Sequence, residues 1–474
     1  MSAENNPQEE DDKKEDGGVE DDLKKALESI HDELDDMECY HGNMLEEDMK
    51  AAVQRDGDFL LRTKMMPDGS KRILLTVKFK GEILDIRLRA KSIANSDPPK
   101  YLFSFDNKTM RTAIKDIMDK HRMNTPVLWR KESVMLLNLV ARSSWELKKD
   151  HLTLEKKIGE GAFGEVHSGK LKYRFPEGPR TINVAVKVIK RSANNEKATT
   201  ELQKEGALMR RFKHENVVKM YGMVFERDSI MVVMELVNGG GLNDYVKKNK
   251  VSPDEKSQYA LDIANGLSYI HSLHCIHRDI ACRNCLLDVK GKGNKIAKVS
   301  DFGLTRQTEM HRVTTDEKIP IRWIAPEVLR TYEYTRAADI YAYAILVWEI
   351  FSNGAMPFEN MTNAQIKEGI KDTAFRPIFP SGTPADIMDT IGPCWDSEPA
   401  ARPELKEVIK KLWKYNRRSN GNDIDTGCEA SNPPDGGLPR AGNRARSNES
   451  KKTDRRSKKI KSKEKNNTMK STKK

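Results

Sequence analysis

The sequence contains few of the features that stabilise secreted proteins or anchor proteins in membranes. Only six cysteines occur among 474 residues, unevenly spaced and without a signal-peptide core, which predicts reduced thiols and a cytoplasmic protein. The longest apolar runs, such as residues 230–237, are far shorter than the ~20 residues that a membrane-spanning helix needs. Residue 2 is serine, so the glycine that N-terminal myristoylation requires is missing. We therefore expect neither a membrane-spanning helix nor a myristoyl anchor.

The sequence also lacks the signatures of zinc-finger and RNA-binding modules. Cys282 and Cys285 form a CxxC pair, but no second pair of ligands accompanies them, so a metal site is disfavoured. The formal net charge is +11 and the pI is about 9.1, but a basic balance alone does not indicate nucleic-acid binding. We expect no nucleic-acid partner.

Hydrophobic residues are sparse and charged residues are abundant. Hydrophobic residues make up 37% of the chain and charged residues make up 33%, which predicts ordered domains joined to solvated segments. Residues 1–38 hold sixteen Asp and Glu but four Lys, and residues 440–474 hold fifteen Lys and Arg but three acidic residues. Such runs are typical of disordered tails. The basic end has two further interpretations, which are attachment to the anionic inner face of the plasma membrane and a nuclear-import signal.

The acidic head ends in an apolar seam. Leu23, Leu27, Ile30, Leu34 and Met37 recur at alternating intervals of four and three residues, as on one face of a helix. The seam lasts only about two heptads, which favours a short helix packed on the next domain over a dimerising coiled coil.

The remaining sequence divides into two ordered regions. A helix, alternating strands and a second helix over the first region predict an α+β domain, and the second region changes from β-rich to helical near residue 254. We predict an acidic head with a short amphipathic helix at 1–38, an α+β domain at 39–140, a linker at 141–151, a larger domain at 152–415 and a disordered basic tail at 416–474.

A glycine-rich motif opens the larger domain. Residues 158–166 read IGEGAFGEV, and glycines at these intervals let a β-hairpin backbone fold closely over nucleotide phosphates. For this motif alone, a Rossmann turn or an ordinary loop remains an alternative. The candidate nucleotide-binding residues are Ile158, Gly159, Glu160, Gly161, Ala162, Phe163, Gly164, Glu165 and Val166.

A lysine and a glutamate follow at informative positions. Residues 184–187 read VAVK on a predicted strand, so Lys187 can emerge beneath the glycine-rich loop and neutralise the α- and β-phosphates. Glu205 lies on a predicted helix at the position expected to form an ion pair with Lys187. A solvated lysine is the alternative interpretation.

Two further motifs carry the residues needed for phosphoryl transfer. Residues 277–284 read HRDIACRN, and residues 301–303 read DFG. Asp279 is placed to accept the proton of the attacking hydroxyl, while Asn284 and Asp301 can hold Mg²⁺, or Mn²⁺, between the phosphates.

These motifs, in this order, resemble the eukaryotic protein kinases over residues 152–415. The resemblance implies a two-lobed fold with ATP between a small β lobe and a larger helical lobe. Met234 would lie beside the adenine pocket as the gatekeeper, and the backbone of Glu235 to Val237 would bind adenine as the hinge. The resemblance also implies that Asp339 steadies the catalytic loop, which is residues 277–284. It further implies that Glu327 of the APE motif, residues 325–327, pairs with Arg402.

Two markers resemble the tyrosine kinases within that family. Position 281 is Ala, where serine/threonine kinases usually carry Lys, and Arg283 precedes Asn284, so we count Arg283 among the catalytic residues. Residues 318–323 read KIPIRW, the tyrosine-kinase form of the substrate platform. We therefore predict transfer to tyrosine in protein substrates. A serine/threonine or dual-specificity kinase and an inactive scaffold are the alternatives.

The first ordered region resembles an SH2 domain. Tyr40, His41 and Gly42 match its YHG motif, and GDFLLR, which ends at Arg62, matches its FLVR motif. A planar guanidinium at Arg62 could bind two phosphate oxygens, although a structural salt bridge is the alternative. With ELVNGG in the hinge, the chain is similar to the Fes/Fer branch without its F-BAR domain. We expect an SH2-like domain followed by a two-lobed kinase fold, with phosphotyrosine proteins as partners. The candidate phosphotyrosine-binding residues are Arg62, Lys64 and Arg87.

Several positions depart from these families. Glu46 replaces a second phosphate-binding Arg, Asp85 replaces a common His, and Cys39 replaces the usual Trp. Two acidic residues near a dianion oppose its binding, so we expect a weaker phosphotyrosine reader or one with unusual preferences. Residues 307–317 contain no tyrosine, although kinases of this branch are switched on by phosphorylation there. Asp316 and Glu317 could supply a standing negative charge in that segment.

Overall fold

The computed structural model describes residues 20–419, except 67–69, 95, 98, 124, 162–163, 191–195, 227–228, 292–293, 315–316 and 318. The acidic residues 1–19 and the basic residues 420–474 lie outside this range, so their disorder and the attachment of the tail to lipid stay predictions. Within the described part of the chain, no helix has both the length and the apolar character needed to span a membrane.

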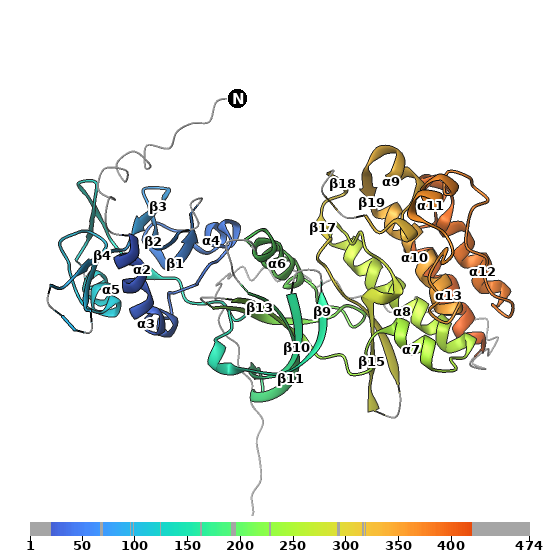
Figure 1. Cartoon of the computed structure of the whole chain (residues 1–474), viewed down its shortest axis with the longest axis horizontal. Helices are drawn as coiled ribbons and strands as arrows, with labels where there is room; N and C mark the ends of the chain where they lie inside the picture. The colour runs from blue at the N-terminus through green and yellow to red at the C-terminus, as the bar shows by residue number, and fades with distance from the viewer. Residues whose placement is uncertain are drawn as a thin grey trace, which may run out of the picture. The chain divides into compact units, whose positions relative to one another are not determined.

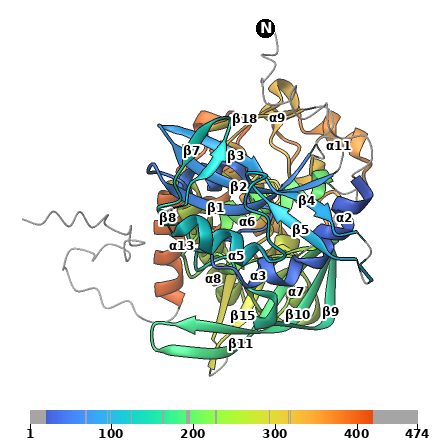
Figure 2. The same ribbon diagram turned by 90° about the vertical axis from the view of Figure 1, so that its left-hand side faces the viewer.

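The N-terminal module, residues 20–140, is built around a four-stranded sheet with the order β3-β2-β1-β8. Strands β1, β2 and β3 are antiparallel neighbours, and β8 pairs in parallel with β1. Figure 2 shows the separate β4–β5 pair beside this sheet. The elements are α4 (Glu46–Ala52), β1 (Asp58–Met65), β2 (Lys71–Phe79), β3 (Glu82–Arg87), β4 (Arg89–Ser92), β5 (Tyr101–Ser104), α5 (Ile114–Arg122), β6 (Val127–Trp129), β7 (Glu132–Val134) and β8 (Asn138–Leu139).

Both faces of β1 are covered, so its first six residues are all buried. Side chains alternate between the two faces of a strand. Phe59 and Leu61 pack in the larger core with residues of α5, whereas Leu60 packs with Met49 of α4. Arg62 lies two residues after Leu60 and therefore faces the α4 side of the sheet.

The acidic head ends in two short helices that pack on this module. They are α2 (Glu20–Ser29) and α3 (His31–Asp36). The predicted seam therefore breaks at Ile30, between the helices. Ala26, Ile30 and Leu34 are buried in the core of the module, and Leu27 and Met37 pack against it. The seam is used within the chain, as expected for a short packed helix.

The second region begins with a five-stranded antiparallel sheet in the order β12-β13-β11-β10-β9. Helix α6 lies beside this sheet (Figure 1), against β11, β12 and β13. Strands β11 and β13 are rich in valine and isoleucine, which pack well on a pleated surface. The elements are β9 (Leu152–Gly161), β10 (Gly164–Phe175), β11 (Gly178–Lys190), α6 (Glu196–Met209), β12 (Met220–Phe225) and β13 (Ser229–Glu235).

Part of the predicted linker adds to the edge of this sheet. The backbone N–H of Leu147 donates to the carbonyl of Met223 at 2.8 Å, and the N–H of Met223 donates to the carbonyl of Trp145 at 2.7 Å. The ring of Trp145 meets that of Phe225 edge-on, with centroids 6.1 Å apart. Residues 145–147 are therefore held to β12.

The remainder of the second region is mainly helical and surrounds α10. This helix is buried on nearly every side, as its apolar sequence requires. Helix α8 begins at a serine cap, because Ser252 accepts a hydrogen bond from the N–H of Glu255 and proline follows at the first helical position. The helices of this part are α7 (Leu242–Lys248), α8 (Pro253–Ser272), α9 (Pro326–Thr331), α10 (Arg336–Phe351), α11 (Asn363–Gly369), α12 (Ala385–Ile391) and α13 (Leu405–Ser419). Its short strands are β14 (Cys275–Ile276), β15 (Cys285–Val289), β16 (Lys295–Val299), β17 (Arg306–Gln307), β18 (Met310–Arg312) and β19 (Glu333–Thr335), and single 3₁₀ turns occur at η3 (Cys282–Asn284) and η5 (Ile321–Trp323).

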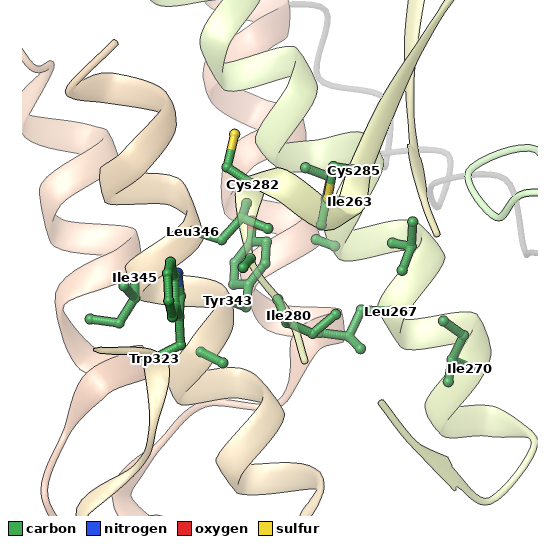
Figure 3. Close-up of a cluster of buried hydrophobic side chains, with 14 of the residues drawn as sticks. Ile263, Leu267, Ile270, Ile280, Cys282, Cys285, Trp323, Tyr343, Ile345 and Leu346 are labelled. Carbon is green, nitrogen blue, oxygen red and sulfur yellow. The ribbon is translucent and has the colours of Figure 1, made fainter. Parts of the chain in front are cut away.

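The cysteines of the CxxC pair belong to the core between α8 and α10. Figure 3 shows Cys282 and Cys285 in one cluster with Leu267 and Tyr343. Both thiols are free and buried, and burial raises the pKa of each. Across the described residues, no group of three or more His, Cys, Asp or Glu side chains is arranged to hold a metal ion. The pair therefore packs as small apolar side chains.

A buried ion pair fixes α9 to the end of the helical part. Both arms of Arg402 contact the Glu327 carboxylate, at 2.7 Å each. Arg402 also donates to the carbonyl of Ala337, just inside α10. Removing either partner would leave an uncompensated buried charge, so the pair constrains this part of the fold.

Candidate active site

A buried ion pair joins the five-stranded sheet to α6. Lys187 lies on β11 opposite Val232, and its Nζ atom is 2.9 and 2.8 Å from Oε1 and Oε2 of Glu205. The same Nζ is 3.8 Å from Oδ1 of Asp301. Burial opposes the charge on Lys187, but the carboxylates of Glu205 and Asp301 outweigh burial and raise its pKa. The amine therefore stays protonated and is held in place by both acidic residues.

Asp301 is positioned by strained backbone and a buried neighbour. Its φ angle is 60°, which is uncommon for a residue with a side chain. The ring of Phe302 is buried, with its centroid 5.0 Å from that of Phe212 and 5.3 Å from that of His277. This packing holds the segment, and the Asp301 side chain remains about half exposed.

Asp279 lies between β14 and η3 with both carboxylate oxygens engaged. The Nη2 atom of Arg283 donates to Oδ1, and the Nδ2 atom of Asn284 donates to Oδ2 at 2.7 Å. Each carboxylate oxygen can accept a further hydrogen bond. The guanidinium of Arg283 also lies over the ring of Trp323, 4.1 Å from its centroid. These contacts fix the orientation of the Asp279 carboxylate, and its oxygens can still accept a hydrogen bond from a hydroxyl.

The backbone before Asp279 is held by Asp339 of α10. The N–H of His277 donates to Oδ2 of Asp339 at 2.7 Å, and the N–H of Arg278 donates to Oδ1 at 2.8 Å. The ring of His271 lies 2.9 Å from Oδ2. Burial opposes the charge on Asp339, but these partners outweigh it and lower the pKa of the carboxyl.

The glycine-rich segment spans the end of β9 and the start of β10. Gly161 and Gly164 face each other across the antiparallel pair, and Ala162 and Phe163 lie outside the described residues. A Cβ atom on Gly164 would lie 2.3 Å from the carbonyl oxygen of Val188, so only glycine fits there. Of the other predicted nucleotide-binding residues, Ile158, Gly159 and Glu160 lie on β9, whereas Glu165 and Val166 lie on β10. The carboxylates of Glu160 and Glu165 both contact Lys157, at 3.0 and 2.9 Å.

The predicted hinge begins at Glu235, the last residue of β13. The side chain of Glu235 is used within the protein, because its carboxylate contacts Nζ of Lys298 at 2.8 and 3.0 Å and accepts the N–H of Lys219 at 2.8 Å. Val237 is buried against the core of the helical part. Any contact of Glu235 with a nucleotide base would therefore involve its backbone.

Glu349 is a site residue that the sequence motifs did not indicate. Its Oε2 atom accepts the backbone N–H of Cys282 at 2.9 Å and the indole N–H of Trp323 at 2.8 Å. One buried carboxyl thus joins the segment that carries Asp279 to the segment that carries Trp323. The only signal in the sequence is a lone glutamate in the apolar run of α10.

In the N-terminal module, Arg62 is enclosed by acidic side chains. Its Nη1 atom is 2.9 Å from Oε1 of Glu46, and its Nη2 atom is 2.6 Å from Oδ2 of Asp85. Its Nε atom donates to Oγ1 of Thr76, which in turn donates to Oδ1 of Asp85. Only 1% of the Arg62 side chain is exposed, against 49% for Glu46.

The other two predicted phosphate-binding residues lie near this cluster. The Nζ atom of Lys64 is 3.4 Å from Oε1 of Glu46 and 3.9 Å from Oδ2 of Asp85. Arg87 lies two residues after Asp85 on β3. Burial opposes the charge on Glu46, but Arg62 and Lys64 outweigh it and lower its pKa. Glu46 therefore carries its negative charge beside Arg62 at neutral pH.

Comparison with known proteins matches the second region to the family model described as protein tyrosine and serine/threonine kinase, over residues 152–412. Fer-related kinase 1 of Caenorhabditis elegans is 34% identical over 389 residues, which cover 82% of this chain and 96% of that protein. Tyrosine-protein kinase Fer of Homo sapiens is 32% identical over 81% of this chain, which spans 44% of Fer. The transforming protein Fps of Avian sarcoma virus (strain PRCII) is 31% identical over 80% of this chain and 68% of its own length.

The buried carboxyl of Glu349 predicts a pH dependence of stability. Burial raises the pKa of Glu349 from 4.5 to about 7. The folded protein therefore holds this proton more tightly than the unfolded chain, and the unfolding free energy should fall as pH rises from 4.5 to 7. The difference between the folded and unfolded pKa values of Glu349 corresponds to a loss of about 3 kcal/mol of unfolding free energy. Glu349→Gln cannot ionise, so its urea-unfolding midpoint should change less over this pH range than that of the wild type.

The exposed Glu368 on α11 offers a matched control for this experiment. Glu368→Gln should leave the pH profile of the wild type unchanged. If Glu349→Gln and Glu368→Gln have the same profile, Glu349 does not titrate as its burial requires.

Proposed function

The chain belongs to the Fes/Fer-like branch of the non-receptor protein tyrosine kinases, and on that basis we propose that it transfers the γ-phosphate of ATP to tyrosine hydroxyls of protein substrates. The observation that carries this proposal is the orientation of Asp279, whose two oxygens have separate donors from Arg283 and Asn284. A carboxylate fixed in this way can accept the proton of a hydroxyl as that hydroxyl attacks phosphorus.

The remaining residues have separate roles in the transfer. Lys187, held by Glu205, would neutralise charge on the α- and β-phosphates, and the glycine-rich segment at the end of β9 and the start of β10 would cover the phosphates. Arg283 orients Asp279 and faces the substrate platform through Trp323. The backbone of Glu235 and Val237 binds the adenine ring, since the Glu235 carboxylate is already paired with Lys298.

The side chains present also suit Mg²⁺. Asn284 uses its amide nitrogen on Asp279, which leaves its oxygen as a ligand, and the Asp301 carboxylate is half exposed. Mg²⁺ prefers oxygen ligands and is commonly held by one or two side chains together with substrate phosphates. Asn284 and Asp301 would hold the ion, and Mn²⁺ has similar ligand preferences. When bound, the ion neutralises charge that develops on the phosphates.

Two features favour tyrosine over serine or threonine as the acceptor. Position 281 is Ala, so no lysine reaches the γ-phosphate from there. Arg283 and Trp323, which come from the two sequence markers of the tyrosine class, contact each other. A phenol extends further from the peptide backbone than a serine hydroxyl, so the platform must hold a tyrosine peptide at a greater distance from Asp279. The contact between Arg283 and Trp323 links the platform to Asp279 and would set that distance. An inactive scaffold would need a defect in Lys187, Asp279 or Asp301, and all three are present.

We predict that Asp279→Asn lowers kcat by about 10²-fold to 10⁴-fold, as is typical when a general base is lost. Because Asn has nearly the same shape, folding and ATP binding should change little. Radiolabel transfer to a tyrosine peptide measures kcat, and titration with a fluorescent ATP analogue measures nucleotide binding. Asp389→Asn, on the exposed side of α12, is the matched control. Near-native turnover of Asp279→Asn would show that another group accepts the proton.

We also propose that the N-terminal module is an SH2 domain that brings this cytoplasmic kinase to phosphotyrosine proteins. Arg62, Lys64 and Arg87 would contact the phosphate. Support comes from the position of Arg62 on the central strand, facing the first turn of α4. In the structure, the Arg62 guanidinium is paired with the carboxylates of Glu46 and Asp85, so a phosphate must displace at least one of these carboxylates. We therefore propose that the module binds phosphotyrosine weakly.

Glu46 is the exposed member of this pair, so it should be the one displaced. Glu46→Gln removes its negative charge from beside the incoming phosphate and should strengthen binding of O-phosphotyrosine about fivefold, or about 1 kcal/mol. Arg62→Ala should abolish binding. Isothermal titration calorimetry of the whole chain measures both effects.

Glu47, the exposed neighbour of Glu46 in the same helical turn, provides the control. Glu47→Gln should leave the affinity unchanged. Equal affinities of wild type and Glu46→Gln would contradict the competition between Glu46 and phosphate. Absence of binding by every variant would show that the module is purely structural.

A further inference from the structure

Arg278, the residue before Asp279, has a carboxylate partner from a distant part of the chain. Its Nη2 atom forms an ion pair with Oε2 of Glu317, 39 residues later. Only 2% of the Arg278 side chain and 19% of the Glu317 side chain are exposed. The Nη1 atom of Arg278 donates to the carbonyl of Leu304 at 3.3 Å. The pair therefore joins the catalytic loop to the segment that follows the DFG motif.

The surroundings of Arg278 require an anion at this position. The positive charge of Arg278 is almost fully buried, and a buried charge is costly unless an opposite charge pairs with it. Glu317 supplies that negative charge. Burial opposes that charge, but the hydrogen bond and charge of Arg278, together with those of His311, outweigh it and lower the pKa of Glu317 to about 2. Glu317 is therefore ionised throughout the neutral range.

Glu317 also holds the segment on its other side. Its Oε1 atom lies 3.0 Å from Nε2 of His311 and accepts a hydrogen bond from the Thr314 hydroxyl at 3.3 Å. His311 lies on β18, where it pairs with Tyr334 of β19. The ring of Tyr334 lies 5.1 Å from the guanidinium of Arg278. One carboxylate thus contacts the catalytic loop and the β18 strand at the same time.

We propose that Glu317 is a positioning residue that keeps the catalytic loop and residues 304–314 in their catalytic arrangement without a phosphate on the segment that follows the DFG motif. The inference rests on the proposed kinase function. Residues 307–317 contain no tyrosine that could carry such a phosphate. A glutamate paired with the buried Arg278 supplies the negative charge permanently, so the enzyme is not switched by phosphorylation there.

The first test needs no variant. The purified full-length chain is treated with tyrosine and serine/threonine phosphatases, complete removal of phosphate is checked by mass spectrometry, and kcat is measured on a tyrosine peptide. The proposal predicts that the treated enzyme keeps at least half of its kcat. Loss of most activity after treatment would overturn it, since a phosphate elsewhere in the chain would then be needed.

The second test compares substitutions of the carboxylate. Glu317→Gln should lower kcat at least tenfold, leave the KM for ATP within about twofold and bind the fluorescent ATP analogue normally. Glu317→Asp retains the charge and should recover part of the loss. Glu309→Gln is the control, because Glu309 lies in the same segment but pairs with Arg336 at its exposed side.

The outcomes separate this proposal from the proposed function. If the untreated wild type transfers no more phosphate than Asp279→Asn, the kinase function itself fails. If the wild type is active and Glu317→Gln matches Glu309→Gln in kcat, only the role of Glu317 is wrong. A parallel loss of kcat and of analogue binding in Glu317→Gln would indicate general unfolding, and the phosphatase result on the wild type then decides the question.

Discussion

The buried carboxylate of Asp339 is the constraint on which the catalytic loop depends. It accepts the N–H groups of two successive residues, His277 and Arg278, and so fixes the backbone where Arg278 has a φ angle of 71°. A residue with a side chain adopts that conformation only when its surroundings impose it. Because the backbone is fixed, Asp279 is directed to Arg283 and Asn284, while Arg278 is directed to Glu317. Proton acceptance by Asp279, as proposed above, and the attachment of the loop to the following segment thus depend on one anchor.

The charged groups of the kinase site are held by partners from the same chain. Lys187 with Glu205 and Arg278 with Glu317 are buried pairs, in which loss of one partner would leave a costly isolated charge. The same principle would act against the phosphate binding that we propose for the N-terminal module. Arg62 is almost fully buried and is satisfied by Asp85, Glu46 and Thr76, so a phosphate would gain only the difference between its own contacts and those it replaces.

Local motifs predicted the parts of the site that lie close together in sequence. Asp279, Arg283 and Asn284 fall within six residues, and the pairing of Lys187 with Glu205 followed from the resemblance to protein kinases. The kinase fold of the second region agrees with the family match over residues 152–412. The continuous burial of the first six residues of β1 also agrees with the sequence, because consecutive apolar residues place apolar side chains on both faces of the strand.

Contacts between distant segments could not be predicted in this way. Glu349 reaches Cys282 across 67 residues, and nothing in the motif distinguishes it from an ordinary acidic residue of α10. Glu46 and Asp85 were expected to repel a phosphate, but the sequence does not show that both contact Arg62 directly. Asp316 and Glu317 were equivalent as sources of negative charge. Only the path of the chain selects Glu317 as the partner of Arg278, and Asp316 lies outside the described residues.

The most direct test of the account is the identity of the residue that receives phosphate. The purified chain is incubated with ATP, Mg²⁺ and an equimolar mixture of three peptides that differ only in carrying tyrosine, serine or threonine at the acceptor position. Mass spectrometry then measures phosphate on each peptide over time. The account predicts phosphate on the tyrosine peptide alone. Comparable rates on the serine or threonine peptide would contradict the role assigned to Arg283 and the platform, and phosphate on none of the three would contradict the kinase function.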